Sequence, residues 1–152
     1  MLDNSPMTNH EVLVPMRWSD MDALQHINNV SMLRLLEEAR IRFMIRFGSG
    51  PDSGRITMFV AHQEIDYVRP LLYSQEPVRI LMRVTRIGGS GFDIGYEVLD
   101  ADGRVAALSE ASMVVVDGAA SGRPAPIPDA LRAQLEEVLG EPVPFRRRRE
   151  SV

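Results

Sequence analysis

The chain has 152 residues, of which 45% are hydrophobic and 25% charged, and its formal net charge is −4. This composition is that of one globular domain able to bury a core, and the negative charge argues against a general nucleic-acid binder. The sequence contains no cysteine, which excludes disulfides and thiol chemistry, and its three histidines lack the close spacing of a metal site.

The first ten residues, MLDNSPMTNH, have neither the positive start nor the apolar run of a secretory signal, and we expect them to form a mobile tail. No apolar run in the sequence is long enough to span a membrane. We therefore expect a cytoplasmic protein that does not associate with membranes.

Residues 11–18 alternate between polar and apolar side chains, with Val12, Val14, Met16 and Trp18 on one face. This alternation predicts the first strand. A helix of about five turns is predicted next, since apolar residues recur at helical spacing up to Phe47. Either Asn28 or Asn29 can cap this helix, with the cap the favoured role of Asn29, and Gly48 and Pro51 are placed to end it.

The rest of the chain reads as strands joined mostly by tight turns. We predict strands over residues 56–68, 77–87, 92–98 and 104–117, with turns at 88–91 and 100–103. A linker over residues 118–128, a short surface helix over 128–139 and a basic tail at 146–149 follow. The domain is thus predicted to span residues 11–118, with residues 119–152 as an appendage, in an α+β fold with one long helix on an antiparallel sheet.

The strongest motif is the run from Asp22 to Asn29, DALQHINN, followed by Glu37-Glu38-Ala39-Arg40. It resembles the hotdog-fold thioesterases, most closely the 4-hydroxybenzoyl-CoA thioesterase-like acyl-CoA thioesterases. The similarity continues through residues 65–70, 95–98 and 113–117. The chain departs from that pattern at Gln25, where many relatives have glycine, at Met32, where many have tyrosine, and at Leu24, where the related plant enzymes have a catalytic asparagine.

The resemblance implies a hotdog fold, in which a curved antiparallel sheet wraps around one long helix. It also implies a homodimer with a continuous sheet, or a homotetramer. The reaction would be hydrolysis of an acyl-CoA to a free acid and CoA, with no cofactor.

Two residues are the candidate catalytic groups. Asp22, just before the helix, could act as general base or as nucleophile, and the family pattern points to the same residue. His26 could orient Asp22, donate to the thioester or protonate the leaving thiolate. The simpler alternatives are a turn carboxylate bonded to local amides and a structural histidine. Asp20 could share a face with Asp22, although a structural role is favoured for it.

The candidate substrate-binding residues are in two places. Amides near Asn28, Asn29 and Val30 could stabilise an oxyanion, because a helix N-terminus carries free N–H groups and partial positive charge. The turn containing Gly88 and Ser90 could admit a pantetheine arm or a phosphate, although a plain hairpin explains it equally well. Arginines such as Arg83 or Arg86, or the basic tail at 146–149, could meet the CoA phosphates.

Alternative functions remain open at this level. The chain could hydrolyse acyl-carrier-protein thioesters, act as a hydratase, or bind acyl-CoA without catalysis. It lacks the His-Phe-Pro-Gly run of the hotdog dehydratases, and it has no room for a DNA-binding helix-turn-helix.

Overall fold

A computed structural model describes residues 9–47 and 56–146. The expected tail over residues 1–8, the helix stop at Gly48 to Pro51 and the basic residues Arg147 to Arg149 lie outside this range. Within it, the predicted order of one strand, one long helix, four strands and a short helix is confirmed.

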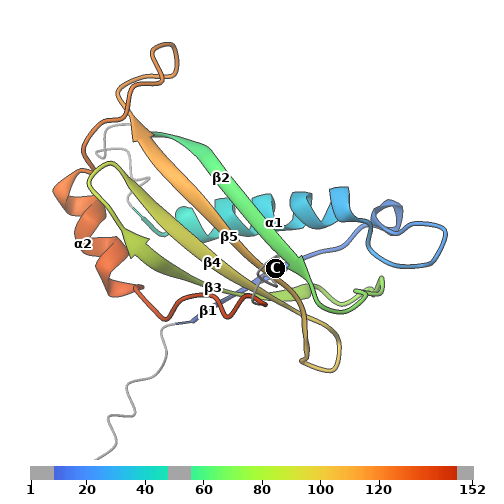
Figure 1. Ribbon diagram of the computed structural model, residues 1–152. Helices are drawn as coiled ribbons and strands as arrows, with labels where there is room; N and C mark the ends of the chain where they lie inside the picture. Colours follow the sequence, from blue (N-terminus) through green and yellow to red (C-terminus); the bar gives the residue numbers. More distant parts are fainter. Residues whose placement is uncertain (1–8, 48–55, 147–152) are drawn as a thin grey trace, which may run out of the picture.

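Five antiparallel strands form one sheet in the order β1-β3-β4-β5-β2 (Figure 1). The strands are β1 (His10–Val14), β2 (Thr57–Tyr67), β3 (Val78–Ile87), β4 (Gly91–Leu99) and β5 (Val105–Val116). The long helix α1 (Asn29–Met44) packs on one face of the curved sheet, and the short helix α2 (Asp129–Glu137) lies beside the β3–β4 turn. This is the predicted hotdog arrangement.

The inner face of the sheet packs against α1. Alternation along the strands places Ile80, Met82, Ile94 and Tyr96 on this face, all fully buried. The apolar stripe predicted for the helix is buried against them through Leu35, Leu36, Ala39 and Phe43. On β5 the inner residues are small, namely Ala107, Ser109 and Ala111, so the sheet leaves room for the helix above its middle strands.

The first strand is shorter than predicted. It ends at Val14, and residues Trp18–Asp20 form a single 3-10 turn instead of continuing the strand. Pro15 accounts for the break, because proline has no N–H to offer a strand partner. Trp18 consequently lies 72% exposed rather than on the buried face.

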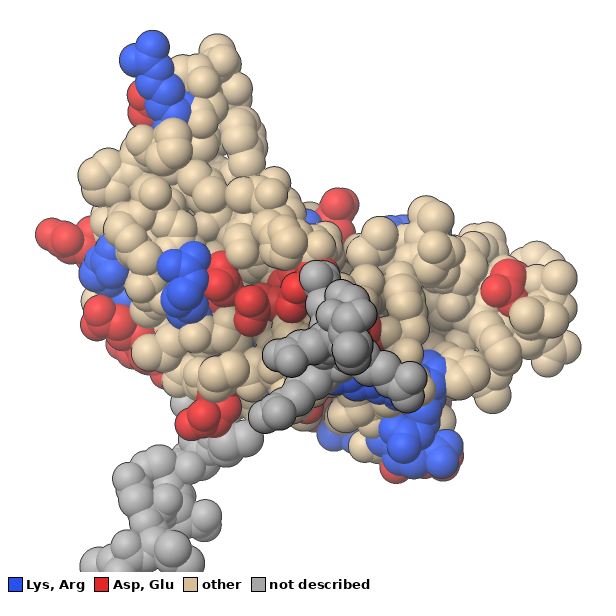
Figure 2. All heavy atoms as spheres, viewed as in Figure 1, with Lys and Arg blue, Asp and Glu red and all other residues tan. Residues whose placement is uncertain are grey.

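The outer face of the sheet is polar and is crossed by the chain's own C-terminal strap, which we define as residues 138–146. Gly140 donates its N–H to the carbonyl of Val84, and the amide of Arg146 bonds the Asp66 carboxylate on β2. Acidic side chains gather over this face, with arginines among them (Figure 2). The predicted surface helix α2 also packs inward, since Leu131 and Leu135 are buried.

Arg83 lies beneath the strap and is only 2% exposed. Its guanidinium donates to Glu97 at 2.6 Å and to the carbonyl oxygens of Glu141 and Pro142. The expectation that Arg83 could meet CoA phosphates is therefore wrong, because its charge is already paired inside the protein.

No helix in the described part of the chain is both long enough and apolar enough to cross a bilayer.

The strap contacts the sheet closely at Gly95. A Cβ built on Gly95 would approach the Val143 Cγ2 atom to 2.6 Å and the Thr85 Cγ2 atom to 2.8 Å. We expect Gly95→Ala to lower the free energy of unfolding by about 1–3 kcal/mol, measured by urea denaturation. Gly89→Ala is the matched control, since no atom lies within 4 Å of its added Cβ. Adding Val143→Ala to Gly95→Ala should restore part of the lost free energy of unfolding. A Gly95→Ala protein as stable as wild type would contradict this packing.

Candidate active site

The loop before α1 folds back on itself and places Asp22 in a tight turn. The Asp22 amide donates to the carbonyl of His26 at 2.8 Å, while Met21 and Ile27 pair as an isolated bridge. The Asp22 Oδ1 atom accepts from the amides of Leu24 at 2.9 Å and His26 at 3.3 Å. One carboxylate oxygen thus holds the turn, and the second has no hydrogen-bond partner among the described residues.

Gln25 completes this turn in a left-handed conformation, with φ of 63°. A non-glycine residue in this region carries a steric cost that glycine would avoid. The β4–β5 turn repeats the geometry. The Asp100 Oδ1 atom accepts from the amides of Asp102 and Arg104, each at 2.9 Å, and Gly103 has φ of 78° at the position that corresponds to Gln25.

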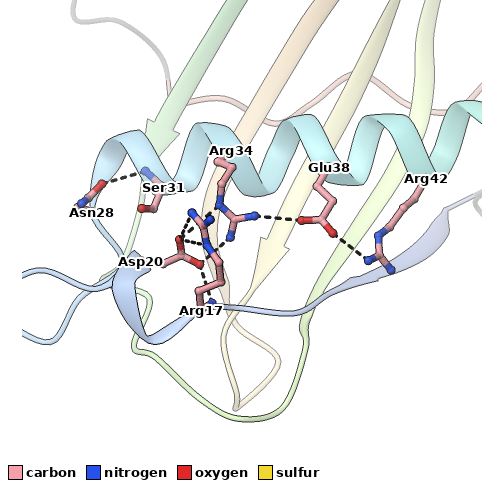
Figure 3. A network of polar contacts seen from close by, with 7 residues as sticks. All are labelled: Arg17, Asp20, Asn28, Ser31, Arg34, Glu38 and Arg42. Atoms are coloured by element: carbon pink, nitrogen blue, oxygen red, sulfur yellow. Dashed lines mark hydrogen bonds and ion pairs between the residues drawn. The ribbon is translucent and has the colours of Figure 1, made fainter.

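Asp20 fixes the loop to the helix (Figure 3). Its fully buried carboxylate accepts from the Arg17 amide at 2.7 Å and from the Arg34 guanidinium at 2.6 Å. Arg34 also bonds Glu38, which bonds Arg42 in turn, so the contacts continue along α1. The favoured structural role of Asp20 agrees with this placement, and Asp20 does not form a carboxylate pair with Asp22.

Asp20 has a lowered pKa. Desolvation by burial pushes the pKa of this carboxyl up, but hydrogen bonds from the Arg17 amide and from the Arg34 and Arg17 side chains outweigh that effect, together with the Arg34 charge. The backbone of Asp20 contributes as well, since its carbonyl accepts the Asn28 amide at 3.0 Å. Asp20 therefore positions Asn28, the residue just before the helix.

Asn28, and not Asn29, caps the helix. The Asn28 side chain accepts from the Ser31 amide at 2.8 Å, and its carbonyl accepts from the Met32 amide at 2.9 Å. The favoured assignment of the cap to Asn29 is thus wrong, because Asn29 is already the first helical residue. The amides of Asn29 and Val30 have no acceptor among the described residues, so two donors remain at the positive end of α1.

A pocket of about 370 Å³ opens at this helix terminus. It is lined by the end of the loop and the end of β2: Asp22, His26, Ile27, Asn28, Asn29, Met32, Tyr67, Val68, Arg69, Pro70 and Leu71. The Tyr67 hydroxyl lies 3.5 Å from the Asn29 carbonyl oxygen, and desolvation by burial raises the pKa of this phenol. Sequence reasoning missed Tyr67 and Arg69 as pocket residues, although both fall in the family-like run at 65–70.

His26 reaches the pocket from the turn, but its contact with Asp22 runs through the backbone. Its amide bonds Asp22, and its backbone pairs with Leu72 in an isolated bridge. No described hydrogen bond involves its imidazole, so the ring does not orient Asp22. The half-buried ring instead lies beside the pocket, where a bound molecule can reach it.

The Gly88–Ser90 turn is not brought to the pocket within one chain. It joins the ends of β3 and β4 that lie away from the pocket, and β3 alone is ten residues long, about 33 Å. Its carbonyls are occupied, that of Gly88 by Arg132 and that of Ser90 by the Val115 amide. Arg86 lies at the same end, paired with Asp93. Binding of substrate by Gly88 and Ser90 remains a prediction that one chain alone does not support.

The described residues contain no group of three or more histidine or acidic side chains that could hold a metal ion. Of the predicted site residues, Asp22, His26, Asn28 and Asn29 line the pocket, and Val30 follows them in the chain without being one of its lining residues.

A family model for the thioesterase-like superfamily matches residues 16–135. The chain belongs to this superfamily. The match covers the loop, α1, the pocket and all strands after β1, so the predicted family and the hotdog fold are confirmed. Thioester hydrolysis is the class of reaction that this membership supports.

Individual relatives agree with the family. A predicted thioesterase from Bacillus stearothermophilus is 29% identical, with a TM-score of 0.75 over 88% of this chain and 98% of that one. A thioesterase from Thermus thermophilus, solved with coenzyme A and Zn, is 33% identical, with a TM-score of 0.73 over 91% of this chain and 99% of that one. The uncharacterised protein YsmA of Bacillus subtilis is 29% identical over 83 residues, 55% of this chain. That match spans about half, 56%, of the length of YsmA.

The contacts of Asp20 predict how stability changes with substitution and with pH. We expect Asp20→Asn to lower the free energy of unfolding by about 2–4 kcal/mol, because Arg17 and Arg34 lose their shared carboxylate. The folded-state pKa of Asp20 lies below its ordinary value of 3.8. The contribution of the Asp20 carboxylate to the free energy of unfolding is therefore complete above that value and is lost as the pH falls through the folded-state pKa.

Urea denaturation at pH 7 and at pH 3–4 measures both effects. Glu38→Gln is the control, since Glu38 belongs to the same network on the helix surface and should change stability little. An Asp20→Asn protein as stable as the Glu38→Gln protein would contradict the assigned role.

Proposed function

We propose that this protein hydrolyses acyl-CoA thioesters, with Asp22 as the general base or nucleophile. The observation that supports this most is the position of Asp22 in the pocket at the N-terminus of α1. One oxygen of its carboxylate is held by two amides and the other is without a described partner. A carboxylate held in this way keeps its orientation while leaving one oxygen for chemistry.

As a general base, Asp22 would remove a proton from water as the water oxygen attacks the thioester carbonyl carbon. As a nucleophile, it would attack the same carbon to form an anhydride that water then opens. In both routes the carbonyl oxygen gains negative charge, the C–S bond breaks, and the products are a carboxylic acid and a thiol.

The amides of Asn29 and Val30 are the proposed donors to the oxyanion. They have no acceptor among the described residues, and they lie at the positive end of the α1 dipole. His26, on the pocket wall, is the proposed proton donor to the leaving thiolate.

Coenzyme A is the proposed thiol carrier, because a relative 33% identical to this chain was solved with coenzyme A. An acyl-carrier protein is the alternative carrier.

The catalytic assignment is tested by Asp22→Asn in a thiol-release assay over acyl-CoAs of increasing chain length. Asparagine keeps the oxygen that holds the turn and loses the charge, so turnover should fall at least ~100-fold while the fold survives. His26→Ala should slow turnover less, since proton donation is a partial contribution.

Asp100→Asn is the matched control, because Asp100 holds the same kind of turn away from the pocket. It should turn over like wild type. Near wild-type turnover by Asp22→Asn would refute the assignment, and equal losses in the Asp22 and His26 variants would make the two an acid–base pair.

We also propose that the protein works as a homodimer, or as a homotetramer built from dimers. β2 is an edge strand whose outer side has no partner strand in one chain, and such edges are usually paired or covered. Exposed apolar side chains flank this edge on β2 and α1: Phe59, Val60, Val30, Leu33 and Ile41. A second copy of the chain would bury both the edge and these side chains.

Light scattering tests this association, with the expectation of a species at least twice the 17.0 kDa of one chain at micromolar concentration. Ile41→Glu, at a position 55% exposed on α1, should shift the protein toward the single chain. Leu139→Glu, at 46% exposure on the strap, should leave the assembly unchanged. A 17.0 kDa species for the wild-type protein would refute the dimer.

A further inference from the structure

Three side chains between α1 and the inner face of the sheet have more hydrogen-bond donors than described acceptors. Arg40 is 9% exposed, and its described hydrogen bond goes to the Tyr96 hydroxyl at 3.4 Å. Tyr96 is fully buried and uses its oxygen to accept from Arg40, so its own O–H has no described acceptor. The buried Nε2 atom of Gln63 also has no partner among the described residues.

This arrangement is unusual because buried guanidinium groups are normally paired with carboxylates. Each other buried arginine or acid described above has an oppositely charged partner, as Arg83 has Glu97 and Asp20 has Arg34. Tyr96 does not supply a negative charge to Arg40. Desolvation raises the pKa of this phenol, an effect larger than the opposing influence of Arg40, so Tyr96 stays neutral.

Two of the three donors lie on the elements that wall the pocket, deeper in the fold: Arg40 on α1 and Gln63 on β2. Tyr96 lies on β4, bonded to Arg40. On α1, Asn29, Leu33, Leu36 and Arg40 are spaced i, i+4, i+7 and i+11, which places them along one side of the helix. On β2, Tyr67, Ile65 and Gln63 alternate toward the inner face. Asn29 and Tyr67, which begin the two rows, meet at the pocket wall.

The two rows reach a similar depth. Arg40 is eleven residues beyond Asn29, about 16 Å along the helix, and its side chain tilts back toward the N-terminus. Gln63 is four residues before Tyr67, about 13 Å along the strand. The register places Tyr96 opposite Ser109 and Gln63 opposite Ala111, so only small β5 side chains lie between their strands.

We propose that Arg40, Tyr96 and Gln63 bind a carboxylate at the far end of the acyl group, so that the preferred substrates are half-thioesters of medium-length dicarboxylic acids. This inference rests on the proposed function for the position of the thioester end. A carboxylate offers acceptors to all three donors at once and supplies the charge that the guanidinium lacks. A saturated acyl chain of the same length would leave all three donors unpaired.

The wild-type protein tests the proposal directly. Suberoyl-CoA and octanoyl-CoA have acyl chains of the same length, but the first ends in a carboxylate and the second in a methyl group. Two further pairs test shorter and longer chains: adipoyl-CoA with hexanoyl-CoA, and sebacoyl-CoA with decanoyl-CoA. We expect kcat/KM to be roughly 10- to 100-fold higher for the dicarboxylic member of at least one pair. Equal values in all three pairs, or higher values for the saturated members, would overturn the proposal.

Variants identify the residues responsible. Arg40→Met keeps the volume of the stem and removes the charge, and it should abolish the preference between the members of a pair. Gln63→Leu removes one uncharged donor and should reduce the preference severalfold, a test that stands if the Arg40 variant does not fold. Arg42→Met is the matched control, since Arg42 lies on the opposite side of α1, bonded to Glu38, and should keep the wild-type preference.

Direct binding separates this proposal from the hydrolytic function. Isothermal titration should show tighter binding of free suberate than of octanoate to the wild-type protein, and no such difference in Arg40→Met. Arg40-dependent suberate binding without thiol release from any acyl-CoA would refute the thioesterase and leave the carboxylate site in place. Thiol release without any preference, and without tighter suberate binding, would refute the site and leave the thioesterase standing.

Discussion

The burial of the Asp20 carboxylate is the constraint on which the active-site geometry depends. A fully buried carboxylate must be satisfied, and it is satisfied only when Arg17 and Arg34 converge on it from the two sides of the loop. That convergence fixes the start of α1, because the Asp20 carbonyl holds the Asn28 amide. The free amides of the first helical turn and the pocket in front of them follow from this one contact.

Within this frame, the chain uses one turn geometry for two purposes. The Asp100 turn connects β4 and β5 and has glycine at its left-handed position, whereas the Asp22 turn has Gln25 there and faces the pocket. The two turns share their backbone hydrogen bonds, but the second oxygen of Asp100 accepts from the Arg104 side chain, whereas that of Asp22 has no partner among the described residues. What sets Asp22 apart is thus its unpartnered oxygen and the helix terminus beside it, while the turn fixes its position.

The elements that follow local patterns were predictable from sequence. Alternation located β3 and β4, a nearly continuous apolar run located β5, and helical spacing located α1. Asp22 and His26 were found through the family-like motif. Contacts between residues distant in sequence were not predictable. The sequence indicated an exposed Arg83, but the strap covers this side chain. Tyr67 lies at the pocket because β2 ends beside α1. Likewise, the sequence near the helix does not decide between Asn28 and Asn29 as the cap, because the Asp20 carbonyl that holds the Asn28 amide lies eight residues earlier.

The strap also sets the order in which the molecule can be completed. Arg83 and Glu97 are both synthesised well before the residues that cover them, and Gly140 to Arg146 lie beyond the last residue of the family match. During translation the sheet and α1 can already meet, since every strand has left the ribosome before the strap does. Until Glu141 and Pro142 emerge, however, the guanidinium of Arg83 on the outer face stays hydrated, whereas in the finished protein it is buried. The strap thus closes over the face of the sheet opposite α1 after the strands have formed, so its closure leaves the pocket at the helix terminus unchanged.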